Sequence, residues 1–309
     1  MANGSGFVHA VDREGLSDFV SEKEGALNVI EQLRGGVKGR WKYGQIRDFV
    51  FALISHERNR IYQTYEIPAL SKQVAPEPVP FTVFRARRLK SPGEWFKSAD
   101  DLGSPIPEKT DKFGRCHQPG APVFYGSLLA ETVLSEIDAE LEDHVVISEF
   151  QIEQDITVIP VGEFDYFWRT RQTYLGAENE ASSKPFEEAL KTIDDNVVPL
   201  IVDAFLADEF IEPARNHTDY KITSAFSDII FNEFGKRYEI DAIVYPSVAF
   251  RGGVNFAFRP DSEKRKMKLI DAKIVEITEA VGLGIFGHRK LGKLKSVVDG
   301  QIEWEKCIE

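Results

Sequence analysis

The sequence predicts an α+β fold, in which short strands and helices are mixed without a regular βαβ alternation. Three observations lead to this expectation. Two helical patterns come first, over residues 17–34 and 46–61, and a proline-studded connector follows over residues 68–80. After residue 80 the pattern changes to short apolar or alternating runs that lie between helical stretches. We therefore expect a small helical N-terminal region before the main domain.

The region after residue 80 is expected to supply the strands. They are predicted over residues 81–86, 122–125, 145–152, 156–161, 242–245, 254–258 and 268–277. A helical stretch over residues 185–209 should break near Pro199, and another over residues 223–234 should stop at Gly235. The first N-terminal helix should stop at Gly35 and Gly36.

Composition indicates an ordinary globular protein and excludes several classes. Of the 309 residues, 42% are hydrophobic and 28% are charged, so a large core is expected. The net charge of −12 argues against general binding of nucleic acid, although a few arginines suffice for a small anionic substrate. The histidines and the two cysteines show no metal-ligand spacing, so no metal is expected. The sequence shows no apolar leader and no run of 18 apolar residues, so we expect a cytoplasmic protein without membrane contact.

We divide the chain into a helical region with its linker (1–80), a main domain (81–280) and a C-terminal extension (281–309). The extension opens with the pattern G-x-G-x-x-G over residues 282–287, which is also the pattern of dinucleotide-binding loops. Only 22 residues follow it, too few for the rest of a βαβ unit of about 30 residues. A glycine turn is the favoured interpretation.

The segment after Tyr125 predicts a short helix that begins near Ser127. Leu129, Val133 and Ile137 would form its apolar face, and at about 100° per residue Glu136 falls within that face. A carboxylate aimed inward costs several kcal/mol unless it is paired or functional. A salt-bridged structural glutamate and a functional one stay equal alternatives from these residues alone. Glu131 falls on the opposite side and is expected to be a solvated surface residue.

Arginines form a second cluster. Arg85 and Arg87 share one face of the first strand of the main domain and Arg88 takes the other, while Gly114 and Arg115 lie in a loop. The guanidinium fork suits a diphosphate, because it donates two parallel hydrogen bonds to phosphate oxygens. Arginines near strand ends are also common as ordinary surface charges.

A third segment places Ser247 at the tip of a strand that Pro246 ends, with Asn255 a few residues later. No G-x-S-x-G pattern surrounds Ser247, so we interpret it as a hydrogen-bonding residue and not as a nucleophile. A simple turn residue is the alternative.

Taken in order, these segments resemble the RES family, which is named for its Arg, Glu and Ser. The resemblance is carried by F-R-A-R at 84–87, G-R at 114–115, P-V-F-Y-G-S-L-L-A-E-T-V-L-S-E at 122–136 and Y-P-S at 245–247. It extends over residues 81–258 and departs from the family where the usual G-R-W-N is G-R-C-H. The stretches between Arg88 and Gly114 and between Gly162 and Arg215 are also longer than in compact members.

The resemblance implies an ADP-ribosyltransferase-like fold and an enzyme that cleaves the nicotinamide–ribose bond of NAD, with no cofactor beyond NAD as substrate. Water as acceptor would make it a glycohydrolase, and phosphate would make it a phosphorylase. It further implies an intracellular toxin with a cognate antitoxin protein. An ADP-ribosyltransferase with a protein or nucleotide acceptor, and an inactive RES-fold binding module, remain alternatives.

The resemblance also assigns roles. A carboxylate near the ribose stabilises the positive charge of an oxocarbenium-like transition state, aromatic rings stack on flat ligands, and arginines hold diphosphates. The expected catalytic residues are Glu136, Arg85 and Ser247, and the expected NAD-binding residues are Arg115, Tyr125 and Asn255. Arg85 and Arg115 would hold the diphosphate, whereas Ser247 and Asn255 would bind hydroxyl or carboxamide groups.

Overall fold

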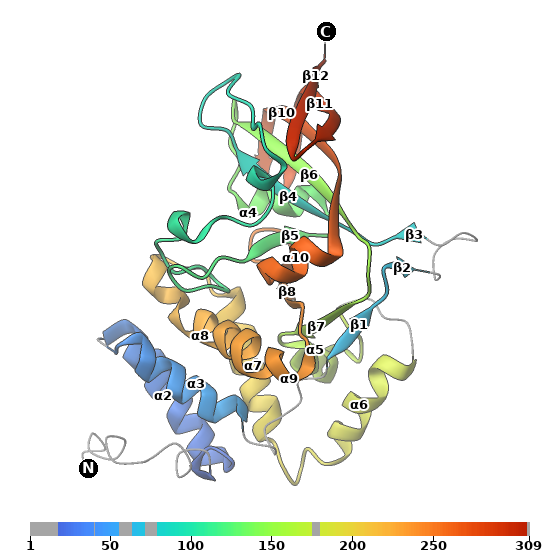
Figure 1. Ribbon diagram of the computed structural model, residues 1–309. Coiled ribbons are helices and arrows are strands. Elements are labelled where there is room, and N and C mark those ends of the chain that lie inside the picture. The colour runs from blue at the N-terminus through green and yellow to red at the C-terminus, as the bar shows by residue number, and fades with distance from the viewer. Residues whose placement is uncertain (1–17, 40, 56–63, 72–78, 175–179, 308–309) are drawn as a thin grey trace. The chain divides into compact units, whose positions relative to one another are not determined.

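The structure is a computed structural model that describes residues 18–39, 41–55, 64–71, 79–174 and 180–307 (Figure 1). The chain forms two compact units, which are described separately. A sheet unit contains residues 64–111, 119–160 and 234–309, and a helical unit contains residues 1–63, 112–118 and 161–233. The α+β class is confirmed. The division at residues 80 and 280 stays a prediction.

The sheet unit is built on ten strands in the order β1-β7-β8-β9-β5-β4-β6-β10-β11-β12. Among these described strands, β7 and β8 pair in parallel, and every other neighbouring pair is antiparallel. The bounds are β1 (Tyr65–Ile67), β4 (Thr82–Arg88), β5 (Phe124–Ser127), β6 (His144–Ile152), β7 (Ile156–Pro160), β8 (Ala242–Pro246), β9 (Val254–Phe258), β10 (Met267–Gly282), β11 (Ile285–Val298) and β12 (Gln301–Lys306). A separate pair joins β2 (Leu70–Ser71) to β3 (Val79–Pro80).

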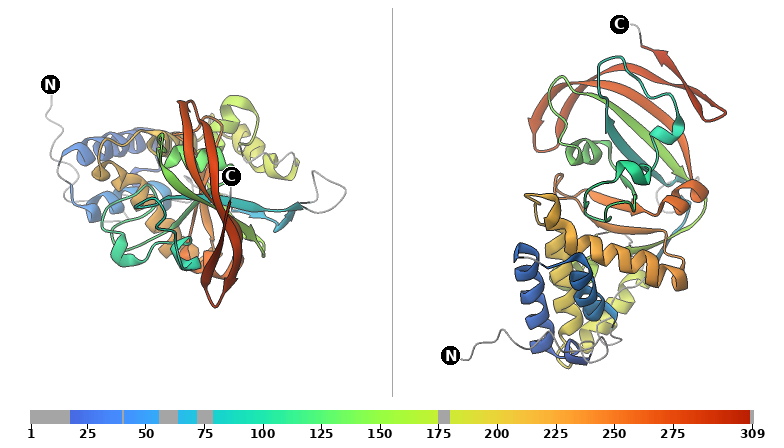
Figure 2. Two further views of the ribbon diagram at one scale, coloured as in Figure 1. Left: turned by 90° about the horizontal axis from the view of Figure 1, so that it is seen from above. Right: turned by 60° about the vertical axis from the view of Figure 1, so that its left-hand side comes forward.

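Each expected strand is present, with shifts of a few residues at its ends. The last of them continues to Gly282 and turns back into β11 (Figure 2, orange to red ribbons). Gly282, Leu283 and Gly284 all have positive φ, at 81°, 57° and 74°. This left-handed conformation favours glycine, so the glycine turn predicted for the G-x-G-x-x-G pattern is confirmed.

The two faces of the sheet bury different side chains. One face is aromatic, and Phe124 lies there edge-on to Phe150 with the ring centroids 4.9 Å apart. Phe256 and Phe258 stack beside them. The opposite face is aliphatic, and the helix α4 (Ala130–Glu136) packs on it. Its buried cluster is Ala86, Val133, Leu134, Ala139, Val145, Ile147, Val275 and Ile277.

The junction between β4 and β5 is narrow, because a single residue pair, Phe84 with Ser127, joins them. By comparison, β4 pairs with β6 along its whole length, and β5 pairs with β9 along its whole length. The smaller helices of this unit are η3 (Ala99–Asp101), η4 (Pro107–Lys109), α9 (Gly235–Tyr238) and α10 (Pro260–Lys266).

The helical unit contains α2 (Lys23–Gly39), α3 (Tyr43–Ser55), α5 (Glu163–Thr170), α6 (Glu180–Lys191), α7 (Val198–Ile211), η5 (His217–Tyr220) and α8 (Lys221–Ile229). The expected break near Pro199 is confirmed, since α6 and α7 are separate and Pro199 lies in the first turn of α7. The expected later part of α3, residues 56–61, lies outside the described residues.

Two expected helix ends are wrong. Helix α2 continues through Gly35 and Gly36 to Gly39, and the ring of Trp41 packs so closely against Gly36 that a side chain there would collide with it. Helix α8 does not stop at Gly235 either. It passes through a π-helical turn, Ile230–Phe234, into α9, and Glu239 in the left-handed conformation ends the run.

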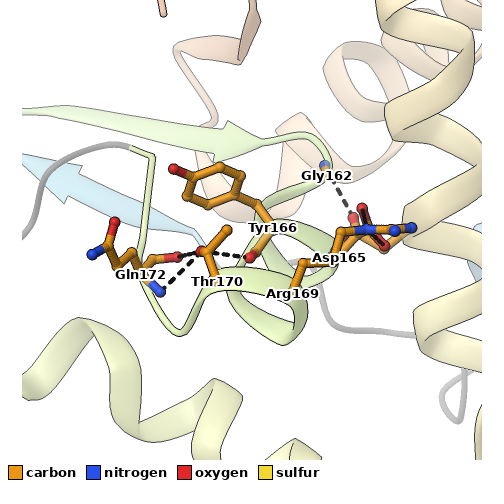
Figure 3. Close-up of polar contacts among 7 residues, drawn as sticks. Gly162, Asp165, Tyr166, Arg169, Thr170 and Gln172 are labelled. Atoms are coloured by element: carbon orange, nitrogen blue, oxygen red, sulfur yellow. Dashed lines mark hydrogen bonds and ion pairs between the residues drawn. The ribbon is translucent and has the colours of Figure 1, made fainter.

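The start of α5 is capped by a side chain from another helix. Gly162, which precedes α5, has no side chain to cap it, and Asp203 of α7 takes that place. Its buried carboxylate accepts hydrogen bonds from the backbone N–H of Gly162 (3.1 Å) and of Asp165 (2.9 Å). Figure 3 shows this end of α5, together with the ion pair between Arg169 and Asp165. Asp203 thus supplies acceptors that a helix N-terminus needs.

The stability contributed by Asp203 should depend on pH. Burial raises the pKa of Asp203 from 3.8 to about 6, against the lowering effect of the backbone N–H groups. The folded state then binds a proton more tightly than the unfolded state, so this contribution is complete below pH 3.8 and is lost as the pH rises through 6. Asn at this position does not titrate. The free energy of unfolding of Asp203→Asn, measured by urea denaturation relative to the wild type, should therefore increase from pH 4 to pH 7. A pH-independent difference would contradict this.

Candidate active site

Helix α4 carries Glu136 at its C-terminal end, and its place in the fold comes from the burial of Val133 and Leu134. The helix begins at Ala130 and not near Ser127, because Ser127 remains in β5, where its Oγ donates to Val254 O (2.6 Å). The expected apolar face is also partly wrong. Leu129 is 45% exposed, and Glu136 lies on an exposed side of the helix. Glu131 is exposed, as expected.

Two side chains from a distant part of the chain converge on Glu136. Ser247, just after β8, donates its Oγ hydrogen to Glu136 Oε1 (2.6 Å). Asn255 of β9 donates from Nδ2 to the same oxygen (2.5 Å) and is itself buried. Glu136 Oε2 has no hydrogen-bond partner among the described residues. The two donors thus fix the orientation of one carboxylate oxygen.

The loop between β8 and β9 holds Ser247 in a closed turn. Ser247 N donates to Gly253 O (2.8 Å), and Phe250 N donates to Ser247 Oγ (3.0 Å). The serine hydroxyl is therefore an acceptor and a donor at once. The presentation of Ser247 at the tip of a strand is confirmed, and its environment is that of a hydrogen-bonding residue.

Arg85 lies at the narrow junction between β4 and β5. Its Nη1 donates to the backbone oxygen of Tyr125 (2.6 Å), and its guanidinium lies over the ring of Phe124, 4.9 Å from the centroid. Arg85 Nε is buried and has no hydrogen-bond partner within the described part of the chain, and burial lowers the pKa of this side chain to about 9, with the charge of Arg87 contributing. The guanidinium lies on the aromatic face of the sheet, whereas Glu136 belongs to the helix over the aliphatic face. The structure links Arg85 to Tyr125 through the backbone and brings it into no hydrogen bond with Glu136.

The expected alternation along β4 is confirmed. Arg87 lies on the same face as Arg85 and donates to Gly103 O (2.6 Å). Arg88 takes the other face, where it donates to the backbone oxygens of Ile137 (3.2 Å) and Asp138 (2.7 Å) just beyond α4.

A comparison with known protein families matches residues 82–276 to the RES domain, which is more than half of the chain. The chain belongs to the RES family. This family is associated with NAD-utilising enzymes and with toxin–antitoxin pairs. No curated protein matches the chain. Strands β11 and β12 lie beyond the matched residues of the RES domain.

Arg115 of the RES domain belongs to the helical unit. The turn that carries it is closed by backbone hydrogen bonds between Gly114 and His117, and a side chain at Gly114 would collide with the His117 ring. In the G-R-C-H sequence of this chain, which replaces the usual G-R-W-N, the histidine therefore packs against the glycine and closes the turn. Arg115 donates to Phe210 O at the end of α7 and lies over the ring of Tyr220, 5.1 Å from the centroid. Its donors serve the helix terminus, and a role on NAD stays a prediction.

Three residues at the site were not predicted from the RES-domain sequence. Thr132 lies one turn before Glu136 and is fully buried, and its Oγ1 finds no hydrogen-bond partner among the residues that the structure describes. Phe250 supplies the backbone N–H that holds Ser247. Arg88 binds the end of α4. Helical spacing from Glu136 indicates Thr132, whereas no local pattern indicates the other two.

Within the described residues, no group of three or more His, Cys, Asp or Glu side chains is placed to hold a metal ion. No helix in the same part of the chain has the length and apolar character that a membrane span needs.

The contact between α4 and the Ser247 loop can be tested by crowding it. A Cβ at Gly253 would lie 2.6 Å from Thr132 Oγ1 and 2.9 Å from Thr132 Cγ2. Gly253→Ala should therefore destabilise the protein by about 1–3 kcal/mol, as overpacking does. Thr132→Ala removes both atoms, so the double variant should be more stable than the sum of the single effects. Thermal melts of the four proteins measure this coupling, and strictly additive effects would show that the two segments do not pack as described.

Proposed function

We propose that this RES protein cleaves the nicotinamide–ribose bond of NAD, with Glu136 as the charge-stabilising group. The observation that carries the proposal is the asymmetry of the Glu136 carboxylate. Oε1 is held by Ser247 and Asn255, whereas Oε2 has no partner among the described residues, and the residue is exposed. An anchored carboxylate with one open oxygen suits a reaction that develops positive charge beside it.

The chemistry needs such a group. When the bond from ribose C1 to the pyridinium nitrogen breaks, both bonding electrons leave with nicotinamide, which becomes neutral. The ribose carbon carries positive charge until the acceptor oxygen adds to it, and the acceptor then loses a proton. A fixed negative charge lowers the energy of this state without reorganising in the reaction.

The roles of Ser247 and Asn255 are revised within this proposal. Both donors point to Glu136 Oε1, and the Ser247 hydroxyl also accepts from Phe250 N. They therefore orient the carboxylate first, and contact with hydroxyl or carboxamide groups of NAD is secondary. The ring of Tyr125 is proposed to pack against nicotinamide or ribose.

Arg85 is the proposed anchor for the diphosphate. It is a half-buried cation whose buried Nε has no hydrogen-bond partner among the described residues, its Nη1 donates to a backbone carbonyl, and burial lowers its pKa to about 9. An anion that reached it would offset the cost of keeping a guanidinium in an apolar setting. Arg115 is assigned the same kind of contact from the family resemblance alone.

The acceptor distinguishes the remaining alternatives. Water gives free ADP-ribose, phosphate gives its phosphorylated form, and a protein or nucleotide acceptor makes the enzyme an ADP-ribosyltransferase. An inactive binding module gives no product. Purified protein incubated with NAD, with and without phosphate, followed by mass analysis of the products, separates these four cases.

In cells, we propose a toxin that depletes NAD in the cytoplasm and is restrained by a cognate antitoxin protein. The association of the family with toxin–antitoxin pairs supports this role. General binding of nucleic acid is not proposed, because the net charge is −12.

Glu136→Gln should keep the fold and lose most of the NAD cleavage. Removal of a charge-stabilising group of this kind costs about 3 kcal/mol, or roughly a hundredfold in rate. Glu131→Gln on the same helix is the matched control and should change little, because Glu131 is exposed. Equal rates for the wild type and Glu136→Gln, at equal folded fractions, would remove Glu136 from the mechanism.

Expression of the wild type, but not of Glu136→Gln, should lower NAD and arrest bacterial growth.

Arg85→Ala should weaken NAD binding, and Arg88→Ala should affect it less. A lost charged hydrogen bond costs about 1.5–3 kcal/mol, which is roughly a tenfold to hundredfold loss of affinity. The two effects are measured by titrating NAD into Arg85→Ala and Arg88→Ala proteins that also carry Glu136→Gln, which prevents consumption of NAD during the titration. A larger loss for Arg88→Ala than for Arg85→Ala would reverse the assignment of the binding face.

A further inference from the structure

The C-terminal end of α4 is tied to β4 by one side chain. Arg88 Nη2 donates to Ile137 O (3.2 Å) and Asp138 O (2.7 Å), the first two residues after Glu136. The same nitrogen pairs with Asp143 Oδ2 (2.9 Å), and that oxygen also accepts from Glu140 N (2.8 Å). Arg88, Asp143 and the helix end thus form one connected cluster, here called the Arg88 clamp.

The helix needs such support, because it is short and weakly capped. It spans seven residues, Ala130–Glu136, and Leu129 at its N-terminus makes no side-chain cap. A helix of this length does not form alone in water, and its last carbonyls lack partners within the helix. Asp138 has φ of +50°, a left-handed conformation that is costly for a residue other than glycine. A cation at this end satisfies the carbonyls and favours the helix dipole.

We propose that Arg88 is a positioning residue for Glu136, so that the clamp sets the place of the carboxylate by holding the backbone that carries it. This inference rests on the proposed NAD cleavage. Ser247 and Asn255 bind the carboxylate oxygen of Glu136 directly. Arg88 instead holds the backbone that follows Glu136. Arg88 makes no hydrogen bond with the Glu136 carboxylate itself, and its contacts are with carbonyl oxygens and with Asp143.

If Arg88 has this positioning role, its removal should lower kcat and leave KM nearly unchanged. Loss of the clamp lets the carboxylate shift relative to ribose, and a displacement of about 1 Å can cost a hundredfold in rate. The residues proposed to bind NAD are untouched, so KM should stay within about twofold. Arg88 is 46% exposed, so its removal is not expected to unfold the protein.

The test compares Arg88→Ala, Arg88→Lys and a control in the full-length protein. Arg289→Ala removes another surface ion pair of the same unit, that with Glu276, and Arg289 is 47% exposed. We expect kcat to fall about tenfold to a hundredfold in Arg88→Ala with an unchanged KM. Arg88→Lys should recover part of the loss, because an ammonium group can satisfy one carbonyl but not the whole clamp. Arg289→Ala should resemble the wild type.

A second measurement does not depend on NAD. The backbone N–H groups of Ile137, Asp138 and Ala139 donate hydrogen bonds to carbonyl oxygens within α4. Hydrogen exchange of the peptide over residues 130–139 should be faster in Arg88→Ala than in Arg289→Ala. If Arg88→Ala does not fold, Arg88→Lys and Asp143→Asn replace it in both measurements.

The outcomes separate the two proposals. If the wild type leaves NAD intact, the proposed function fails. Faster hydrogen exchange in Arg88→Ala would then show only that the Arg88 clamp stabilises the end of α4. If the wild type cleaves NAD and Arg88→Ala keeps its kcat, the positioning role is overturned. An equal loss in Arg289→Ala, or a loss in KM alone, overturns it as well.

Discussion

The site depends on a helix that cannot stand by itself. Helix α4 is seven residues long, and it exists where it does because Val133 and Leu134 are buried against β4, β6 and β10. Burial of two such side chains contributes about 3–6 kcal/mol, more than the intrinsic helix preference of so short a segment can supply. Since those strands come from distant parts of the chain, the carboxylate of Glu136 reaches its place only when the sheet has formed in register. The candidate chemistry is therefore a consequence of the sheet, not of the helix that displays it.

Several polar groups around this helix together position the Glu136 carboxylate. One oxygen of Glu136 is held by Ser247 and Asn255, from the loop and the strand that follow β8. The loop is in turn closed by its own backbone and lies against Thr132 of α4, so the anchors and the anchored residue share one packing contact. Arg85 is different in kind. It is a cation kept among aromatic side chains at the cost of a lowered pKa, which is the type of group that gains most from an anionic ligand.

The strands could be predicted from the sequence, as could the three residues that meet at the candidate site, whereas helix ends and long-range contacts could not. The strands could be predicted because buried strands have apolar or alternating runs that are visible in the local sequence. Trp41 packs against Gly36 where helix α2 passes its glycines, and the Ser127 hydroxyl in β5 donates a hydrogen bond to Val254 O. Neither contact leaves a local pattern in the sequence. Glu136 was identified, yet for a partly wrong reason. It does not lie in the buried stripe, and its partners come from residues more than a hundred positions away. Periodicity could not separate a structural from a functional glutamate, and the functional interpretation of Glu136 comes from the order of motifs along the chain.

The narrow junction between β4 and β5 has a mechanical consequence. A sheet resists shear through its ladder of backbone hydrogen bonds, and here one residue pair does the work that a full ladder does on either side. Strain in the sheet should concentrate at that point. Beside it, the Arg85 guanidinium of β4 donates a hydrogen bond to Tyr125 O of β5. A side-chain hydrogen bond rearranges at lower cost than a ladder of backbone hydrogen bonds breaks, so this junction should yield before the longer ladders on either side of it do.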